Sequence, residues 1–523
     1  MSPRCVEGAM VTTGELQALA RGVIGAGFDG TTPENAPLAE LQELQPGAVM
    51  LFGRNVGSAG HLRRLIAALR AVTPLPPLIA IDQEGGRVAR IRDDAVAQLP
   101  SAMAFGAAGD PALARTCAAL LGRDLARLGI SVDFAPVADL ALAPASTVIG
   151  TRAFGDDPRR AGDFAAAFAR GLREGGVAAA VKHFPGHGAT AADSHDVLPH
   201  VDSAAEIPFV RAIAAGGAAM VMAAHVVVDA IDPDVPASLS PAVLTGLLRG
   251  TMGFTGVIVT DCLQMDAIAG GIGTVPGAVR AIAAGADLAL ISHDPALARG
   301  AAEAVAAAAA DGTLPPARLQ EAAARVCALR ERYAVLAPCE ADLDANAPAA
   351  AALRSITVLR GDVRLSGDAV TVMSFEGGVT DRAARSGATA GTEDATLSSA
   401  LRRRKKKSEL MRVPLAPAAD DVELLLEHLP RLGEREFIIV IRRADLYPAQ
   451  RDAVARILEV VPNAILVSSR EPFDALLWPA ARRVLCTYGD EPLAFAAAAG
   501  VLCGAAPAQG VLPVRVSETF PVR

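Results

Sequence analysis

A short segment of this chain concentrates side chains that transfer protons. Three of its eight histidines lie between Lys182 and His195, in the sequence Lys-His-Phe-Pro-Gly-His-Gly-Ala-Thr-Ala-Ala-Asp-Ser-His. Histidine has the unperturbed pKa nearest neutrality, so such a cluster indicates proton transfer or metal ligation. An apolar run (176–181) precedes the segment, and Pro and Gly then interrupt it, as expected of a functional loop that leaves a strand.

Within this segment, Asp193 and His195 are separated by a single residue. An aspartate that holds one ring nitrogen of a histidine fixes its tautomer and raises its basicity, which makes the histidine an acid/base group near neutrality. The same spacing is compatible with a loop turn at Asp193 and an exposed His195 that has no catalytic role. The spacing of His183, His187 and His195 matches neither of the common histidine zinc motifs, so we expect no metal site.

A second candidate is Asp261, which directly follows the apolar run 256–260. A carboxylate at the end of a strand is suited to act as the covalent nucleophile on a glycosyl carbon. The alternative is structural, because an aspartate here can also cap the amino terminus of a helix at 264–269.

The segment Ile-Asp-Gln-Glu-Gly-Gly-Arg (81–87) places Asp82 where it can accept hydrogen bonds from sugar hydroxyls. Its two glycines predict a tight turn, and the chain has no phosphate-binding loop of the Gly-x-x-x-x-Gly-Lys-Ser/Thr type, so we expect no cofactor. Arg90 and Arg152 are the nearby cations. For an isolated arginine, the usual role is a structural salt bridge.

Eight short apolar runs alternate with Ala-rich helical stretches over the first ~335 residues, which is typical of a (β/α)8 barrel. The predicted strands are 22–26, 48–52, 78–81, 131–135, 178–181, 219–223, 257–260 and 287–291. Active sites of this fold lie where the strands end, and polar side chains follow seven of the eight runs. These are Arg54 and Asn55, Asp82, Asp139, Lys182 and His183, His225, Asp261, and Ser292 and His293.

The pattern predicts two α/β domains: a barrel (1–335), a linker rich in Pro, Asp, Asn and Ala (336–355), and a smaller layered α/β domain (356–523). The second domain contains a polar segment, 376–407, which ends in six consecutive basic residues (402–407). We interpret this basic run as a solvated loop or the start of an exposed helix, and not as a nucleic-acid patch.

Composition excludes several classes of protein. The net charge of −8 argues against nucleic-acid binding, and seven scattered cysteines without a Cys-x-x-Cys pair argue against a disulfide framework. We find neither a signal peptide nor an apolar stretch long enough to cross a membrane, so we expect a cytoplasmic location.

Taken together, the motifs resemble bacterial glycoside hydrolase family 3, and in particular its β-N-acetylglucosaminidase branch, which acts in peptidoglycan recycling. They occur in the order typical of that family and extend over nearly the whole chain. The motifs are Leu-Phe-Gly-Arg-Asn (51–55), the segment 81–88, Ile-Gly-Thr-Arg-Ala-Phe-Gly (149–155), the segment 182–188 with Asp-Ser-His (193–195), Thr-Asp-Cys-Leu-Gln-Met-Asp (260–266), and Gly-Val-Leu-Pro-Val (510–514).

The resemblance implies a role for each matching residue. Asp261 occupies the nucleophile position of a retaining hydrolase, and His195, paired with Asp193, occupies the acid/base position. The sugar-binding positions are occupied by Asp82, Arg90, Arg152, Lys182 and His183. The related β-glucosidases take a glutamate acid/base from elsewhere in the fold, so Asp-Ser-His separates the two branches.

Three alternatives accompany this prediction. A histidine acid/base leaves less negative charge than a carboxylate, which favours entry of an anionic acceptor and makes phosphorolysis an alternative to hydrolysis. The second alternative is a carbohydrate-binding protein with a degenerate barrel, but the intact nucleophile and the Asp-His pair argue against it. The third alternative is a metal-dependent barrel hydrolase. The expected partner is a carbohydrate substrate, an N-acetylglucosaminide or a muropeptide.

Overall fold

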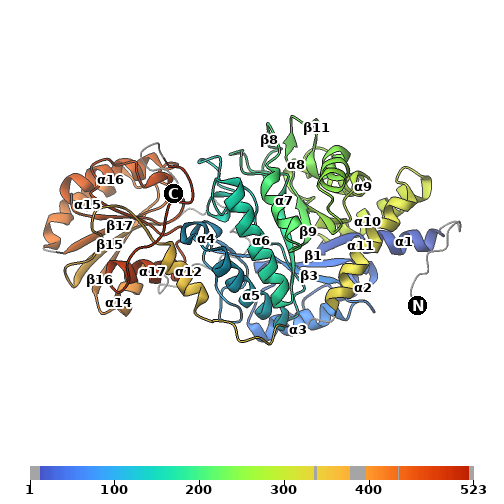
Figure 1. Cartoon of the computed structure of the whole chain (residues 1–523), viewed down its shortest axis with the longest axis horizontal. Coiled ribbons are helices and arrows are strands. Elements are labelled where there is room, and N and C mark those ends of the chain that lie inside the picture. The colour runs from blue at the N-terminus through green and yellow to red at the C-terminus, as the bar shows by residue number, and fades with distance from the viewer. Residues whose placement is uncertain (1–11, 335–337, 377–395, 434, 517–523) are drawn as a thin grey trace.

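The computed structural model describes residues 12–334, 338–376, 396–433 and 435–516. It contains a parallel β-barrel wrapped by helices and a separate sheet domain, which lie side by side along the long axis of the molecule (Figure 1). The predicted fold class, a (β/α)8 barrel followed by a smaller α/β sandwich, is therefore confirmed.

All eight predicted strands form the barrel, which closes in the order β1-β13-β12-β9-β7-β6-β3-β2 with every pairing parallel. Two strands extend at least two residues beyond their predicted ends, because β7 includes Lys182 and His183 and β12 includes Asp261. The bounds are β1 Ile24–Gly27, β2 Ala48–Leu51, β3 Leu78–Ile81, β6 Val132–Asp133, β7 Ala178–Phe184, β9 Ala218–Ala223, β12 Val257–Cys262 and β13 Leu288–Ile291.

Helices cover the outside of the barrel and are delimited by local signals. In α5 (Pro111–Leu128), Asp110 accepts hydrogen bonds from the amides of Ala112 and Leu113, and Gly129 ends the helix in the left-handed region. The others are α1 Thr13–Gly22, α2 Leu38–Leu44, α3 Ala59–Arg70, α6 Pro158–Gly175, α7 Glu206–Ala214, the π-helix η4 Ala242–Thr251, α9 Thr274–Ala284, α10 Pro295–Asp311 and α11 Pro316–Ala334. Among the described helices, none combines the length and the apolar composition needed to cross a membrane.

The amino-terminal end of the barrel is fixed by a buried charge. Asp287, which is fully buried just before β13, pairs with Arg249, Arg318 and Arg325, and its Oδ2 accepts a hydrogen bond from the Ile258 amide. These groups lie opposite the strand ends where the site is expected, so their role is structural.

The second domain is a six-stranded sheet of order β14-β19-β18-β17-β15-β16 in which only β14 is antiparallel to its neighbour. Helices α15 and α16 cover one face, and α12, α14 and α17 cover the other (Figure 1). The bounds are β14 Thr357–Arg360, β15 Ala369–Glu376, β16 Lys407–Pro414, β17 Glu436–Ile441, β18 Ile465–Ser468, β19 Arg483–Cys486, α12 Ala347–Ser355, α14 Leu397–Arg403, α15 Ala419–His428, α16 Pro448–Val460 and α17 Pro492–Leu502.

Some segments carry structure that the sequence did not predict. The predicted linker 336–355 contains α12. The domain boundaries at 335 and 356 remain predictions. In the polar segment 376–407, residues 377–395 lie outside the described part, whereas α14 ends at Arg403 and β16 begins at Lys407. The basic run is thus the end of a helix and a turn at the edge of the sheet.

Candidate active site

The carboxyl-terminal ends of the barrel strands surround a cavity of about 310 Å³. Seven of the eight predicted site residues line it, and the eighth, Asp193, stands behind His195. The seven are Asp82, Arg90, Arg152, Lys182, His183, His195 and Asp261. Residues predicted from five separate parts of the chain therefore come together in one place.

Asp193 and His195 form the predicted pair. Oδ1 of Asp193 lies 2.7 Å from Nδ1 of the ring and also accepts a hydrogen bond from the His195 amide at 2.9 Å. Burial alone lowers the pKa of His195, but the hydrogen bond and charge of Asp193, with the charge of Asp261, outweigh it and raise the pKa above its usual value. The ring is therefore readily protonated near neutrality. Because Nδ1 is bonded to Asp193, Nε2 remains available to a molecule bound in the cavity.

Asp261 lies within β12 and is not a helix cap. The following helix, α8 (Asp266–Ala269), has Met265 at its N-cap, and Oδ1 of Asp261 instead accepts the Cys262 amide at 2.7 Å. Burial raises the pKa of Asp261, but the neighbouring histidines, His183 foremost, and the hydrogen bond from the Cys262 amide outweigh it, so the pKa lies below its usual value. The carboxylate is therefore ionised at neutral pH, as a nucleophile must be.

A network of charges forms one wall of the cavity. Lys182, whose side chain is 2% exposed, places Nζ 2.7 Å from Asp82 and 2.7 Å from Glu84. Arg90 pairs with Asp82 at 3.1 Å, and Arg152 forms two hydrogen bonds of 2.8 and 2.9 Å with Glu84. Both arginines thus have the salt bridges expected of isolated arginines and line the cavity as well.

Glu84 is a member of this network that the sequence analysis missed. Burial raises the pKa of Glu84, yet the charges of Arg152 and Lys182 bring it down to about 2. The residue follows Asp82 by two positions, and residues two apart in an extended segment point to the same side. That spacing was the signal available in the sequence.

Two further buried groups orient cavity residues from behind. Asp139, noted only as a polar residue after a strand, accepts from the His183 ring at 2.6 Å and from the His187 amide at 2.6 Å. Burial lowers the pKa of His225, so its ring is neutral. Its Nε2 lies 2.9 Å from the carbonyl oxygen of Cys262 and donates to it, which leaves Nδ1 to accept from Ser238 at 2.7 Å.

An aromatic pair, Phe52 and His293, also lines the cavity. The Phe52 ring stacks on His293 with centroids 5.7 Å apart, and the Arg54 guanidinium lies 4.5 Å from the Phe52 centroid. In the part of the chain that the structure describes, no three His, Cys, Asp or Glu side chains are grouped as metal ligands. The cavity therefore offers acid/base groups, cations and an aromatic surface.

Both domains of this protein have counterparts in solved structures. A structure of a glycoside hydrolase family 3 beta-N-acetylglucosaminidase from Paenibacillus sp. is 32% identical with a TM-score of 0.86, covering 97% of this chain and 99% of that one. A beta-glucoside phosphorylase has a TM-score of 0.77 at 20% identity, a likeness that bears on the fold alone.

Comparison with known sequences concerns the barrel. A beta-hexosaminidase from Xylella fastidiosa is 41% identical over 294 residues, covering 54% of this chain and 86% of that protein. Another from Pseudomonas aeruginosa is 40% identical over 292 residues, covering 54% and 84%. Residues 14–329 match the model of the glycosyl hydrolase family 3 N terminal domain. Because this match covers more than half of the chain, the protein belongs to glycosyl hydrolase family 3.

Proposed function

We propose that this protein is a retaining exo-β-N-acetylglucosaminidase that removes terminal β-linked N-acetylglucosamine from glycosides such as peptidoglycan fragments. The observation that carries the proposal is that the Asp193–His195 pair and the ionised Asp261 face the same cavity. A retaining mechanism needs this combination of a nucleophile and a separate acid/base. The names of the relatives support N-acetylglucosamine as the sugar.

In the first step, an Asp261 oxygen attacks the anomeric carbon while the bond from that carbon to the leaving oxygen breaks. The protonated His195 gives its Nε2 proton to the leaving oxygen, so the aglycone departs neutral. Asp193 stabilises the imidazolium before the transfer and keeps the remaining proton on Nδ1 afterwards. The product is a covalent glycosyl ester of Asp261.

In the second step, the neutral His195 accepts a proton from water as the water oxygen attacks the anomeric carbon. The ester bond to Asp261 breaks, which restores the carboxylate and the imidazolium. Two displacements at the same carbon return the sugar to its original configuration.

The charged wall binds the sugar. Asp82 and Nε2 of His183, whose Nδ1 donates to Asp139, accept hydrogen bonds from hydroxyl groups, and Lys182, Arg90 and Arg152 donate them. Because the cations and carboxylates are already paired, they are ordered before the sugar arrives, which reduces the entropy lost on binding.

A panel of aryl β-glycosides tests the proposal. We expect the N-acetylglucosaminide to be cleaved much faster than the glucoside and the xyloside, with free N-acetylglucosamine as the product whether or not phosphate is present. Formation of a sugar 1-phosphate identifies a phosphorylase instead, and preference for the glucoside identifies a β-glucosidase. No turnover of any member supports a sugar-binding protein.

A further inference from the structure

The loop that carries Arg152 lies against the second domain. Every residue that lines the cavity falls between Met50 and His293, so the second domain contributes none of the described lining. The loop nevertheless packs into a hydrophobic cluster shared by both domains. Its members include Met103, Val148, Ile149 and Ala153 from the barrel, and Phe375, Ile439, Tyr488 and Val514 from the second domain.

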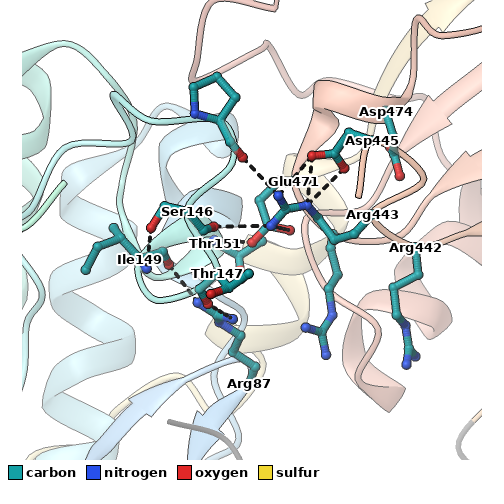
Figure 2. Close-up of polar contacts among 12 residues, drawn as sticks. Arg87, Ser146, Thr147, Ile149, Thr151, Arg442, Arg443, Asp445, Glu471 and Asp474 are labelled. Carbon is teal, nitrogen blue, oxygen red and sulfur yellow. Dashed lines mark hydrogen bonds and ion pairs between the residues drawn. The ribbon is translucent and has the colours of Figure 1, made fainter. Parts of the chain in front are cut away.

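Arg443 of the second domain holds the first part of this loop. Its guanidinium donates to the carbonyl oxygen of Pro144 at 2.9 Å and to that of Ser146 at 3.2 Å, while Asp445 holds it from behind at 2.9 Å (Figure 2). The Arg443 backbone has a φ of 51°, a left-handed conformation that is unfavourable for a residue with a side chain. The contacts across the boundary offset that energy.

Glu471 of the second domain holds the last part. Its Oε1 accepts the Thr151 amide at 3.0 Å (Figure 2). The adjacent Gly150 has a φ of +44°, and a Cβ at this position would lie 1.9 Å from the same Oε1. The carboxylate therefore occupies the space that any side chain at position 150 would need.

The charge of Glu471 is stabilised from both domains. Arg443 lies 3.7 Å from Oε2, and Arg87 of the barrel, itself hydrogen-bonded to the carbonyls of Val148 and Ile149, lies on the other side (Figure 2). Burial raises the pKa of Glu471, but Arg443 and Arg87 outweigh it and keep the pKa below its usual value. The carboxylate is therefore ionised where it meets Thr151.

Thr151 is followed directly by Arg152, whose guanidinium contacts Glu84 and lies 3.2 Å from Nε2 of His183. We infer that Glu471 and Arg443 are positioning residues of the second domain, which fix the Arg152 guanidinium in the sugar-binding wall by holding the loop 144–152. This inference rests on the sugar-binding role of Arg152 in the proposed function.

Four variants test the inference: E471A and G150A remove the contact from either side, R443M removes the contacts to Pro144 and Ser146, and E471Q keeps an acceptor for Thr151. R456A is the matched control, because the Arg456–Glu423 pair lies on the exposed surface of the second domain. The measurements are kcat and KM for an aryl N-acetylglucosaminide, the pH profile, and amide hydrogen exchange of the segment 144–155.

We expect E471A, G150A and R443M to raise KM about tenfold, as for one lost hydrogen bond to a charged group. Exchange of the segment should accelerate, whereas the alkaline limb of the pH profile should stay in place because the Asp193–His195 pair lies on another loop. E471Q should restore KM to within about threefold, and R456A should match the wild type. A merely structural contact would lower the melting temperature without this selective change in KM.

Two results overturn the inference: unchanged exchange of 144–155 in E471A and R443M, or unchanged KM in both. If G150A or E471A fails to fold, R443M and E471Q carry the test. R152A, measured in parallel, locates a failure. Should R152A raise KM while the other variants do not, the positioning inference is wrong. Should R152A also leave KM unchanged, the sugar-binding role of Arg152 is wrong.

Discussion

Replacing Asp193 by asparagine tests the proton transfer assigned to His195. The substitution keeps the size of the side chain but removes the charge 2.7 Å from Nδ1 of the ring. In the wild type, His195 has a raised pKa, so its protonated form, the general acid of the proposed mechanism, persists to a higher pH than for an ordinary histidine. As pH rises through that pKa, the proton is lost and kcat/KM falls.

The expected size of the effect follows from the geometry. Two unit charges about 4 Å apart near a protein surface attract by about 4 kcal/mol. Solvent screens this attraction, because the His195 side chain is 36% exposed, and an asparagine still makes a neutral hydrogen bond. We therefore expect D193N to lower the pKa of His195 by about one unit, which corresponds to about 1.4 kcal/mol.

The assay is the pH dependence of kcat/KM for aryl N-acetylglucosaminides. The alkaline limb of D193N should move about one unit to lower pH, while the acidic limb, which belongs to Asp261, should stay. The loss at a given pH should be larger for poorer leaving groups, because these need the proton most. D229N is the matched control, since the Asp229–His200 pair has the same geometry at 2.9 Å but is exposed.

If a folded D193N keeps its alkaline limb at the wild-type pH, the charge of Asp193 does not raise the pKa of the group that donates the proton, and the reasoning is refuted. A shift of equal size in D229N would show that the limb reports on net charge and not on His195. If the alkaline limb of D193N shifts but the loss of kcat/KM is the same for good and poor leaving groups, the titrating group does not donate the proton to the leaving oxygen.

Three further substitutions separate chemistry from stability. D261N should lower kcat by more than about 10³-fold, because the attacking carboxylate is lost, and should lower the melting temperature slightly, because the depressed pKa of Asp261 means that the folded state favours its charged form. K182M removes the cation shared by Asp82 and Glu84, which keep only Arg90 and Arg152 as partners, and should destabilise the protein by about 1–3 kcal/mol in urea at pH 7. That deficit should shrink as pH falls from about 4, the ordinary carboxyl pKa, to about 2, the pKa of Glu84. D287N, at the opposite end of the barrel, should destabilise by about 3–5 kcal/mol and leave kcat/KM unchanged.

Much of the barrel was predictable because two local signals coincide in it. Apolar runs of strand length alternate with helical stretches, and polar residues stand at the ends of the runs, so the sequence pattern alone places Asp82, Lys182 and Asp261 at one end of the barrel. The exact ends of the strands were not predictable. Lys182 and Asp261 are charged residues in mostly apolar strands, and only the pairing with neighbouring strands shows that β7 and β12 continue through them.

The missed strand β16 has a physical reason. Lys407–Pro414 is an edge strand that pairs only with β15, and its charged residues, Lys407, Glu409 and Arg412, are exposed. Such charges protect a sheet edge from aggregation, but they also hide the apolar pattern by which strands are recognised. The contact of Glu471 with the Thr151 amide was not predictable either. The two residues are 320 positions apart, and local sequence patterns carry no information about contacts over that distance.

The two catalytic loops are held to different degrees, and the mechanism accounts for the difference. In the loop of Arg152, residues 148–152 are buried, and the charged side chains of Arg87, Arg443 and Glu471 hydrogen-bond to the loop backbone, which suits a wall that must keep one geometry for one sugar. The loop of His195 exposes the neighbouring Val197 to 53%, and Ser194 anchors it through contacts of 3.4 Å to the Ala267 amide and 3.2 Å to the His187 ring. In the proposed mechanism, His195 protonates the leaving oxygen and then accepts a proton from a water molecule that enters after the aglycone departs, and the more open loop suits this exchange of aglycone for water.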